Sequence, residues 1–65
     1  MDNSSNLLIL KQLIKEYERA QNSVNRQLEY EVATDITDIA QRMEINAMKN
    51  FHSQARNDKN SENLI

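Results

Sequence analysis

The sequence predicts an all-α protein that folds as a helical hairpin of two or three helices. Gly and Pro are both absent from its 65 residues, and the tight turns of β-hairpins usually need the positive φ that glycine supplies. Apolar residues also recur at intervals of three and four, which is the period of an amphipathic helix. Both observations favour helices over strands.

The short chain limits how the protein can be stabilised. We predict one domain over residues 1–65, ordered over about residues 5–56. A chain of this size buries only a modest share of its surface on folding. Cys is absent, so disulfides and zinc sites built on Cys pairs are excluded. We therefore expect a homo-oligomer, because association is the remaining common means of support for such a small core.

The first half of the chain contains the densest apolar segment, residues 7–14. The polar residues before it are predicted to fray, with Ser4, Ser5 or Asn6 as the N-cap of the first helix. On a helical wheel one apolar stripe gathers on a single side. Its members are Leu10, Leu13, Ile14, Tyr17, Val24 and Leu28.

The second half has its own apolar stripe, made of Val32, Ile36, Ile39, Ala40, Met43, Ala47 and Phe51. This stripe centres about 80° away from the first, so one straight helix cannot bury both. The chain must break, at residues 22–25 or at residues 32–38. We favour the second site, with Thr34 as N-cap and Asp35 and Asp38 close to the positive end of the new helix. Residues 22–25 remain the alternative.

The ends of the chain lead to expectations about order and location. Residues 57–65 are too polar to form a core and are predicted to be a disordered tail. The chain begins with Met and shows neither a secretory signal nor an apolar run of about 20 residues. We therefore expect a complete small cytoplasmic protein. The segment 7–20 is amphipathic but has no Trp or Phe on its apolar side, so membrane binding is not expected.

The sequence offers few residues that could form a catalytic site or a metal site. The only His, His52, is about 100° around the helix from Ser53, so the two cannot face each other as base and nucleophile. Glu31, Asp35 and Asp38 share one side of a helix, but no glycine-containing calcium loop accompanies them. We predict a non-enzymatic protein with no catalytic residue, no cofactor and no metal.

Binding is the function that remains. Five apolar residues fall off both stripes, and we predict that they contact a protein partner: Leu8, Ile9, Tyr30, Ile45 and Met48. The leading hypothesis is a regulator or adaptor of bacterial or phage type. The alternative is a dimeric nucleic-acid-binding protein that uses basic ridges on its helices, above all Arg42, Lys49, His52 and Arg56. The net charge of −2 does not by itself favour a polyanion partner.

Overall fold

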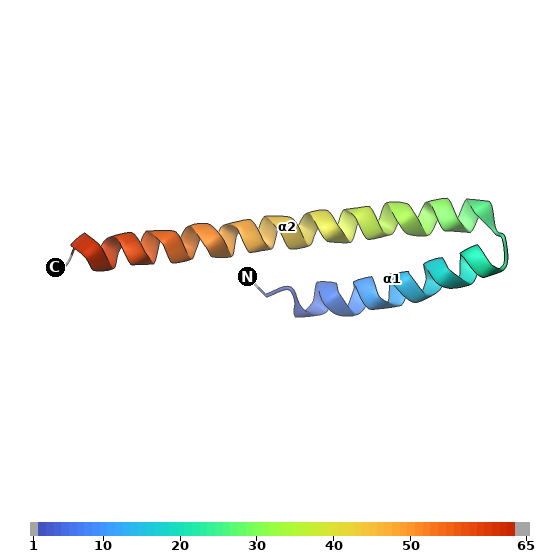
Figure 1. Cartoon of the computed structure of the whole chain (residues 1–65), viewed down its shortest axis with the longest axis horizontal. Coiled ribbons are helices and arrows are strands. Elements are labelled where there is room, and N and C mark those ends of the chain that lie inside the picture. Colours follow the sequence, from blue (N-terminus) through green and yellow to red (C-terminus); the bar gives the residue numbers. More distant parts are fainter. Residues whose placement is uncertain (1, 64–65) are drawn as a thin grey trace.

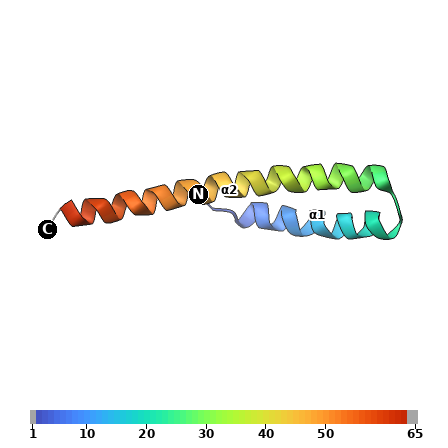
Figure 2. The ribbon, with the colours of Figure 1, turned by 45° about the horizontal axis from the view of Figure 1, so that its top comes forward.

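The computed structural model is a hairpin of two antiparallel α-helices (Figure 1). It describes the backbone of residues 2–63 and the side chains of residues 2–55. Helix α1 covers Ser4–Asn22 and helix α2 covers Arg26–Asn63. The molecule measures 61 × 15 × 12 Å, and α1 lies along the first part of the longer α2 (Figure 2). The predicted all-α hairpin is confirmed, with two helices in the described residues.

The turn between the helices has the hydrogen bonds of a Schellman motif. The Val24 N–H donates to the Gln21 carbonyl at 3.2 Å, and the Asn25 N–H donates to the Ala20 carbonyl at 2.9 Å. The motif places one residue in the left-handed region, and here Val24 adopts it with φ of 54°. Glycine usually takes this position. A β-branched side chain is disfavoured there, so the turn is strained.

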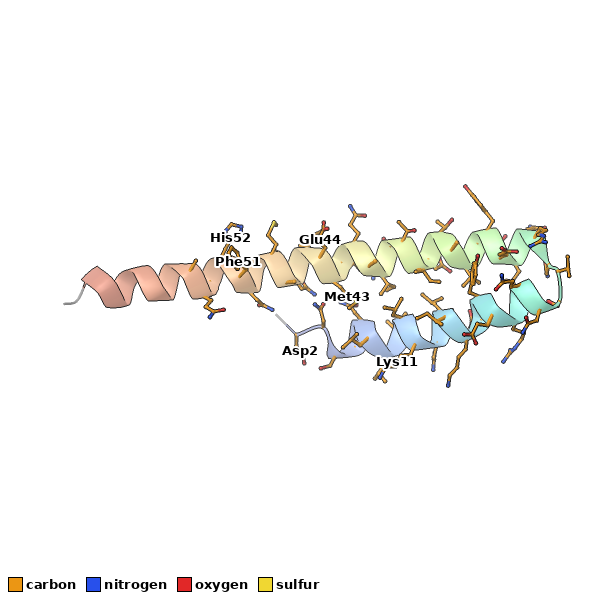
Figure 3. The ribbon with its side chains drawn as sticks, in the orientation of Figure 1. Asp2, Lys11, Met43, Glu44, Phe51 and His52 are labelled. Atoms are coloured by element: carbon orange, nitrogen blue, oxygen red, sulfur yellow. The ribbon has the colours of Figure 1, made fainter. Side chains whose placement is uncertain are left out.

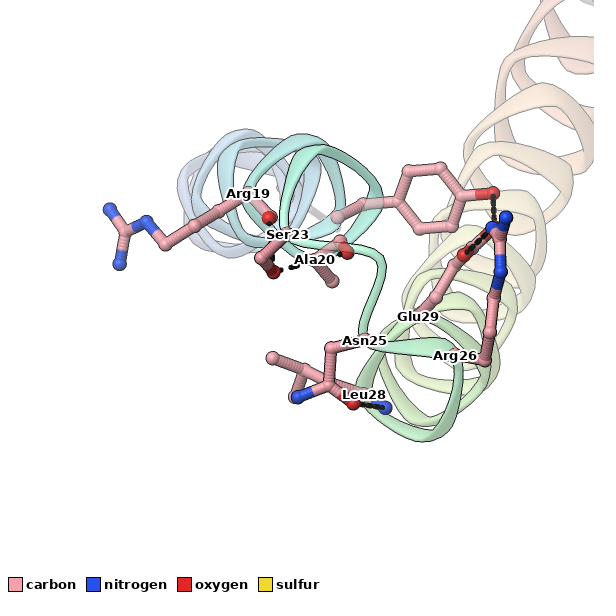
Figure 4. A network of polar contacts seen from close by, with 8 residues as sticks. Arg19, Ala20, Ser23, Asn25, Arg26, Leu28 and Glu29 are labelled. Atoms are coloured by element: carbon pink, nitrogen blue, oxygen red, sulfur yellow. Dashed lines mark hydrogen bonds and ion pairs between the residues drawn. The ribbon is translucent and has the colours of Figure 1, made fainter.

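Asn25 is the N-cap of α2, directly after this turn. Its Oδ1 accepts a hydrogen bond from the Leu28 N–H at 3.2 Å, and its carbonyl accepts one from the Glu29 N–H at 3.0 Å. The Ser23 hydroxyl donates to the Arg19 carbonyl at 2.9 Å, at the end of α1 (Figure 4). These side chains satisfy backbone groups that the two helix ends leave without helical partners.

The helix break favoured near Thr34 is wrong, and the alternative at residues 22–25 is confirmed. Helix α2 runs through residues 32–38 without interruption. The Thr34 hydroxyl donates to the Tyr30 carbonyl and the Thr37 hydroxyl donates to the Ala33 carbonyl, both at 3.0 Å. Threonine fits inside a helix in this way. The capping groups of residues 23–25 therefore outweigh the weak helix propensity of residues 32–38.

The helices meet along a seam whose residues are alternately three and four positions apart, the repeat of a coiled coil. The seam residues are Asn3, Asn6, Leu10, Leu13, Tyr17 and Ala20 on one side and Glu29, Val32, Ile36, Ile39, Met43 and Asn46 on the other. Among the described residues, Ala20, Val32 and Ile39 are buried and the other seam residues are half-buried. The core is thus one narrow row of side chains.

Asparagines join the helices at the open end of the hairpin. The Asn46 amide donates to Asn3 Oδ1 at 2.9 Å, and the Asn3 amide donates to the Met43 carbonyl at 3.2 Å. The Asn6 amide also donates to Asn3 Oδ1, at 3.1 Å. With Asn3 opposite Asn46, the antiparallel register places Leu10 opposite Ile39. This register positions every other residue of the hairpin.

The N-terminal segment differs from the expected frayed end. Helix α1 begins at Ser4, and Asn3 occupies the N-cap position without a side-chain cap. The Asp2 carboxylate takes the capping role instead, because it accepts hydrogen bonds from the Ser4 N–H at 3.0 Å and the Ser4 hydroxyl at 2.7 Å. Asn3 is then available for its contacts with α2. The sequence pattern does not predict these contacts of Asn3 with Met43 and Asn46 on α2.

Several residues assigned to the apolar stripes are exposed: Ile14, Val24, Leu28, Ala40, Ala47 and Phe51. Val24 lies in the turn and Leu28 belongs to α2, so neither shares the wheel of α1. Phe51 lies beyond the end of α1, where no second helix covers it. The remaining three lie beside the seam rather than in it.

Helix α2 extends past α1 at the open end (Figure 1). Beyond Asn46 it continues for about 25 Å. The α2 backbone remains helical through Asn63, over most of the tail predicted to be disordered, because no Gly or Pro interrupts this stretch. The side chains from residue 56 onward, and residues 64 and 65, lie outside the described part of the chain. Within the described residues, neither helix combines the length and apolar character needed to cross a bilayer.

Candidate interaction surfaces

The one histidine of the chain lies on α2. The His52 ring contacts the Phe51 ring edge-on, with centroids 5.8 Å apart. Both side chains point away from α1 (Figure 3). In the described part of the chain, no group of three His, Cys, Asp or Glu side chains could hold a metal ion. What the described side chains do offer is exposed apolar surface.

One side of the hairpin carries a row of apolar residues beside the seam. Five of its residues each directly follow a seam residue: Leu7, Ile14, Ala33, Ala40 and Ala47. Lys11, Glu18, Thr37 and Glu44 also directly follow seam residues and lie on this side, farther out from the seam. One step along a helix turns a side chain by about 100°. Because the helices are antiparallel and face each other, the same step on both leads to the same side of the hairpin. Tyr30 precedes Ala33 by one turn and Phe51 follows Ala47 by one turn, so they extend this side. We call these seven residues the apolar face.

The opposite side of the hairpin is mainly charged. Its residues directly precede seam residues, and they are Ile9 and Glu16 on α1 and Leu28, Asp35 and Arg42 on α2. Arg42 forms an ion pair with Asp38 at 3.1 Å, and both side chains are well exposed. An exposed pair of this kind contributes little to stability. The row of residues next to the seam is therefore more apolar on one side of the hairpin than on the other.

A polar network borders the apolar face near the turn. A surface hollow of about 290 Å³ is lined there by Tyr17, Arg26, Glu29, Tyr30 and Ala33. The Arg26 guanidinium donates to the Glu29 carboxylate at 2.8 Å and lowers the pKa of Glu29. The Tyr17 hydroxyl donates to the same carboxylate at 3.1 Å, and this hydrogen bond raises the pKa of Tyr17. The network links the ends of both helices next to the turn.

The five predicted partner-binding residues are all exposed, but they do not form a single patch. Leu8, Ile9, Ile45 and Met48 lie at the open end, within about 12 Å of one another along the hairpin axis. Ile9 and Ile45 are on the charged side, whereas Leu8 and Met48 point outward from the backs of their helices. These four residues share the open end of the hairpin but point in three directions, and we call them the open-end cluster. Tyr30 lies near the turn, on the apolar face.

The residues predicted to bind nucleic acid all lie on α2. Arg42, Lys49 and His52 are exposed. Arg42 is engaged with Asp38, and the register places Lys49 near the α1 end that carries Asp2. The side chain of Arg56 lies outside the described residues. The described cations thus share their side of α2 with carboxylates.

The apolar face itself was missed in the sequence. The wheels place Ile14, Ala40, Ala47 and Phe51 in the apolar stripes and Tyr30 on a partner-binding surface, and they leave Leu7 and Ala33 in neither group. The signal that could have found it is the repeated placement of an apolar residue directly after a seam residue. That signal can be read only once the break and the register are known.

Comparisons with models of known protein families, with curated proteins and with solved structures give no match for this chain.

Proposed function

We propose that this protein is a small, non-enzymatic interaction module that acts as a regulator or adaptor by binding a partner protein. The observation that supports the proposal is the imbalance between core and surface. The buried core of the described residues is limited to Ala20, Val32 and Ile39, while most large apolar side chains are exposed. Exposed apolar groups that cluster tend to mark binding sites.

We assign the partner to the open-end cluster. Leu8 is 65% exposed and Met48 is 50% exposed, so both can enter a hydrophobic pocket on another protein. Ile9 and Ile45 lie beside Arg42 and other charged residues. Because Leu8 and Met48 point outward from opposite helices, a partner that contacts all four residues would have to enclose the open end of the hairpin.

Nucleic-acid binding is the second candidate, supported by the basic residues of α2. It is the weaker candidate, because affinity for phosphates needs several cations on one continuous surface. Arg42 is paired with Asp38. Titration with random duplex at several salt concentrations separates the two candidates: a steep salt slope indicates phosphate contacts, and a flat response favours the protein partner.

The test of the proposal compares how well the native chain and two double variants retain a partner protein. The double variant Leu8→Ser/Ile9→Ser removes part of the open-end cluster. The matched control Val24→Ser/Leu28→Ser removes the same kind of surface at the turn. Both should keep nearly native helix content, because substitutions of exposed apolar residues away from the core usually alter the free energy of unfolding by only about 0.5 kcal/mol. Relief of the strain at Val24 should make the control somewhat more stable, which leaves its helix content unchanged.

A partner protein should be retained by the native chain and by the control but lost from the open-end variant. Identical retention by all three forms would show that the cluster is not the binding site. Unfolding of the open-end variant would show that Leu8 and Ile9 contribute to the core instead.

A further inference from the structure

The hairpin exposes more surface than a compact protein of its mass. Its accessible surface is 5557 Å², whereas a folded monomer of 7.6 kDa is expected to expose about 4,300 Å². The excess is about 1,250 Å². A stable protein interface covers about 800 Å² on each partner. One interface of ordinary size would therefore bring the chain close to the exposure of a compact fold.

The apolar face is the surface best suited to supply that area. Tyr30 is 74% exposed and Phe51 is 68% exposed, the highest values among the large apolar residues of the described chain. Leu7 and Ile14 add branched side chains from α1. The alanines between them allow a second pair of helices to approach closely. The face is long and straight, which suits another helical hairpin.

We propose that the apolar face binds a second copy of this chain to form an antiparallel four-helix bundle. This goes beyond the proposed function, because it concerns a different face and leaves the open-end cluster accessible to a partner. Four-helix bundles pack helices around a core in this way. The occupant is a second copy because the pattern on the face matches itself.

The match is a two-fold symmetry along α2. The order of residues is Tyr30, Ala33, Ala40, Ala47 and Phe51, which is nearly the same when read in reverse about Ala40. A two-fold axis through Ala40 brings each Ala33 against the other chain's Ala47 and each Tyr30 against the other chain's Phe51. Self-complementarity of this kind is what a two-fold dimer requires. Aromatic pairs at both ends would then close the interface.

The residues of α1 fit the same axis. Leu7 and Ile14 are symmetric about the Leu10–Lys11 step. Leu10 is opposite Ile39 in the hairpin register, and Ile39 is next to Ala40. One axis that lies in the plane of the interface, perpendicular to the helices, therefore relates both helices to their copies, with Leu7 facing the other chain's Ile14.

Two substitutions with the same chemistry test the location of the interface. Ala40→Glu places a carboxylate at the proposed axis, while the matched control Ala55→Glu places it on the outer side of α2, where Ala55 is exposed. Sedimentation velocity over a wide concentration range measures the dimer dissociation constant. Ala40→Glu should raise it at least about a hundredfold, because two unpaired charges would be buried. Ala55→Glu should change it by no more than about twofold.

Cross-linking tests the antiparallel arrangement. The chain has no Cys, so a single introduced Cys reports one position. Ala40→Cys should form an intermolecular disulfide on mild oxidation, because the axis places both copies within bonding distance. Ala47→Cys alone should not link, but a mixture of Ala33→Cys and Ala47→Cys chains should.

A native chain that remains a fully helical monomer at every concentration would overturn the proposal. Equal weakening by both Glu variants would also overturn it. A dimer that Ala40→Cys cannot link would overturn the antiparallel arrangement. Capture of a partner by the open-end cluster is measured in a separate experiment, so absence of the dimer would not contradict the proposed function.

Discussion

The side-chain amide of Asn46 donates a hydrogen bond to Asn3 Oδ1 at 2.9 Å, across 43 positions of sequence. The bond joins the first residues of the hairpin to the last seam residue of α2. Asn at a seam position of a coiled coil commonly selects one register at a cost in stability. We interpret the Asn3–Asn46 contact as the device that fixes this register, and with it the composition of both faces.

Replacing both asparagines tests this role. The double variant Asn3→Leu/Asn46→Leu should melt at a higher temperature, because an apolar pair would extend the seam. It should also lose the single register, visible as extra or broadened amide signals in an NMR spectrum. The single variant Asn46→Ala should instead lower the free energy of unfolding by about 1 kcal/mol. A double variant less stable than the native chain would contradict this interpretation.

The position of the turn can be tested by the sign of two alanine substitutions. Asn25 caps α2, so Asn25→Ala should lower the free energy of unfolding by about 1 kcal/mol. Thr34 lies inside α2, so Thr34→Ala should leave stability unchanged or raise it by a few tenths of a kcal/mol, roughly the propensity difference. Chemical denaturation measures both. If Thr34→Ala lowered the free energy of unfolding as much as Asn25→Ala does, the helix break would lie near Thr34, the site that the sequence favours.

The strain at Val24 should be removable. Val24 has φ of 54° and is largely exposed, so Val24→Gly relieves a disfavoured backbone conformation without opening the core. We expect the free energy of unfolding to rise by about 1 kcal/mol. The matched control Gln41→Gly, in the exposed interior of α2, should lower it by a similar amount. Glycine should thus stabilise the protein at position 24 and destabilise it at position 41. A lower free energy of unfolding in Val24→Gly would argue against the left-handed conformation of this residue.

The fold class and more than half of the seam follow from hydrophobic periodicity. The seam residues that it predicts correctly are Leu10, Leu13, Tyr17, Val32, Ile36, Ile39 and Met43. The seam residues that the pattern missed are polar or small, such as the asparagines of the open end and Ala20. Periodicity of apolar residues cannot detect a seam that continues through Asn.

The break was misplaced because local propensity and capping gave conflicting signals. Thr34 resembles an N-cap and its neighbours are β-branched, whereas the structure uses Asn25 as the cap and accepts strain at Val24. Misplacing the break put Val24 and Leu28 on the wrong helix. The residues of the apolar face can be identified only with the correct register, so the misplaced break also prevents their prediction.

Stability should depend on pH through the network beside the turn. The pKa of Glu29 is lowered from 4.5, so its contribution is present above that pH and is lost as the pH falls through the lowered value. The pKa of Tyr17 is raised from 10.0, so its contribution is present below that pH and is lost as the pH rises through the raised value. The melting temperature should therefore be level between these limits and fall on both sides.

The variant Glu29→Gln should flatten part of the acid slope when melting is followed by circular dichroism. The hydrogen bonds from Ser4 also lower the pKa of Asp2, so Asp2→Asn is the paired control and should remove a separate part of the slope. An acid slope that persists unchanged in the Glu29→Gln variant would contradict the role given to the network.

Both proposed surfaces exist only if the chain folds back on itself at residues 23–25. Spin labels at Ser5 and Glu44, which the register places opposite each other, test this directly. The labelled chain should be diluted with unlabelled protein so that only distances within one chain are measured. Helix axes in contact lie about 8–10 Å apart, so with the label arms included we predict a distance below about 25 Å. One continuous helix, alone or exchanged between chains, would give about 58 Å and would contradict the hairpin.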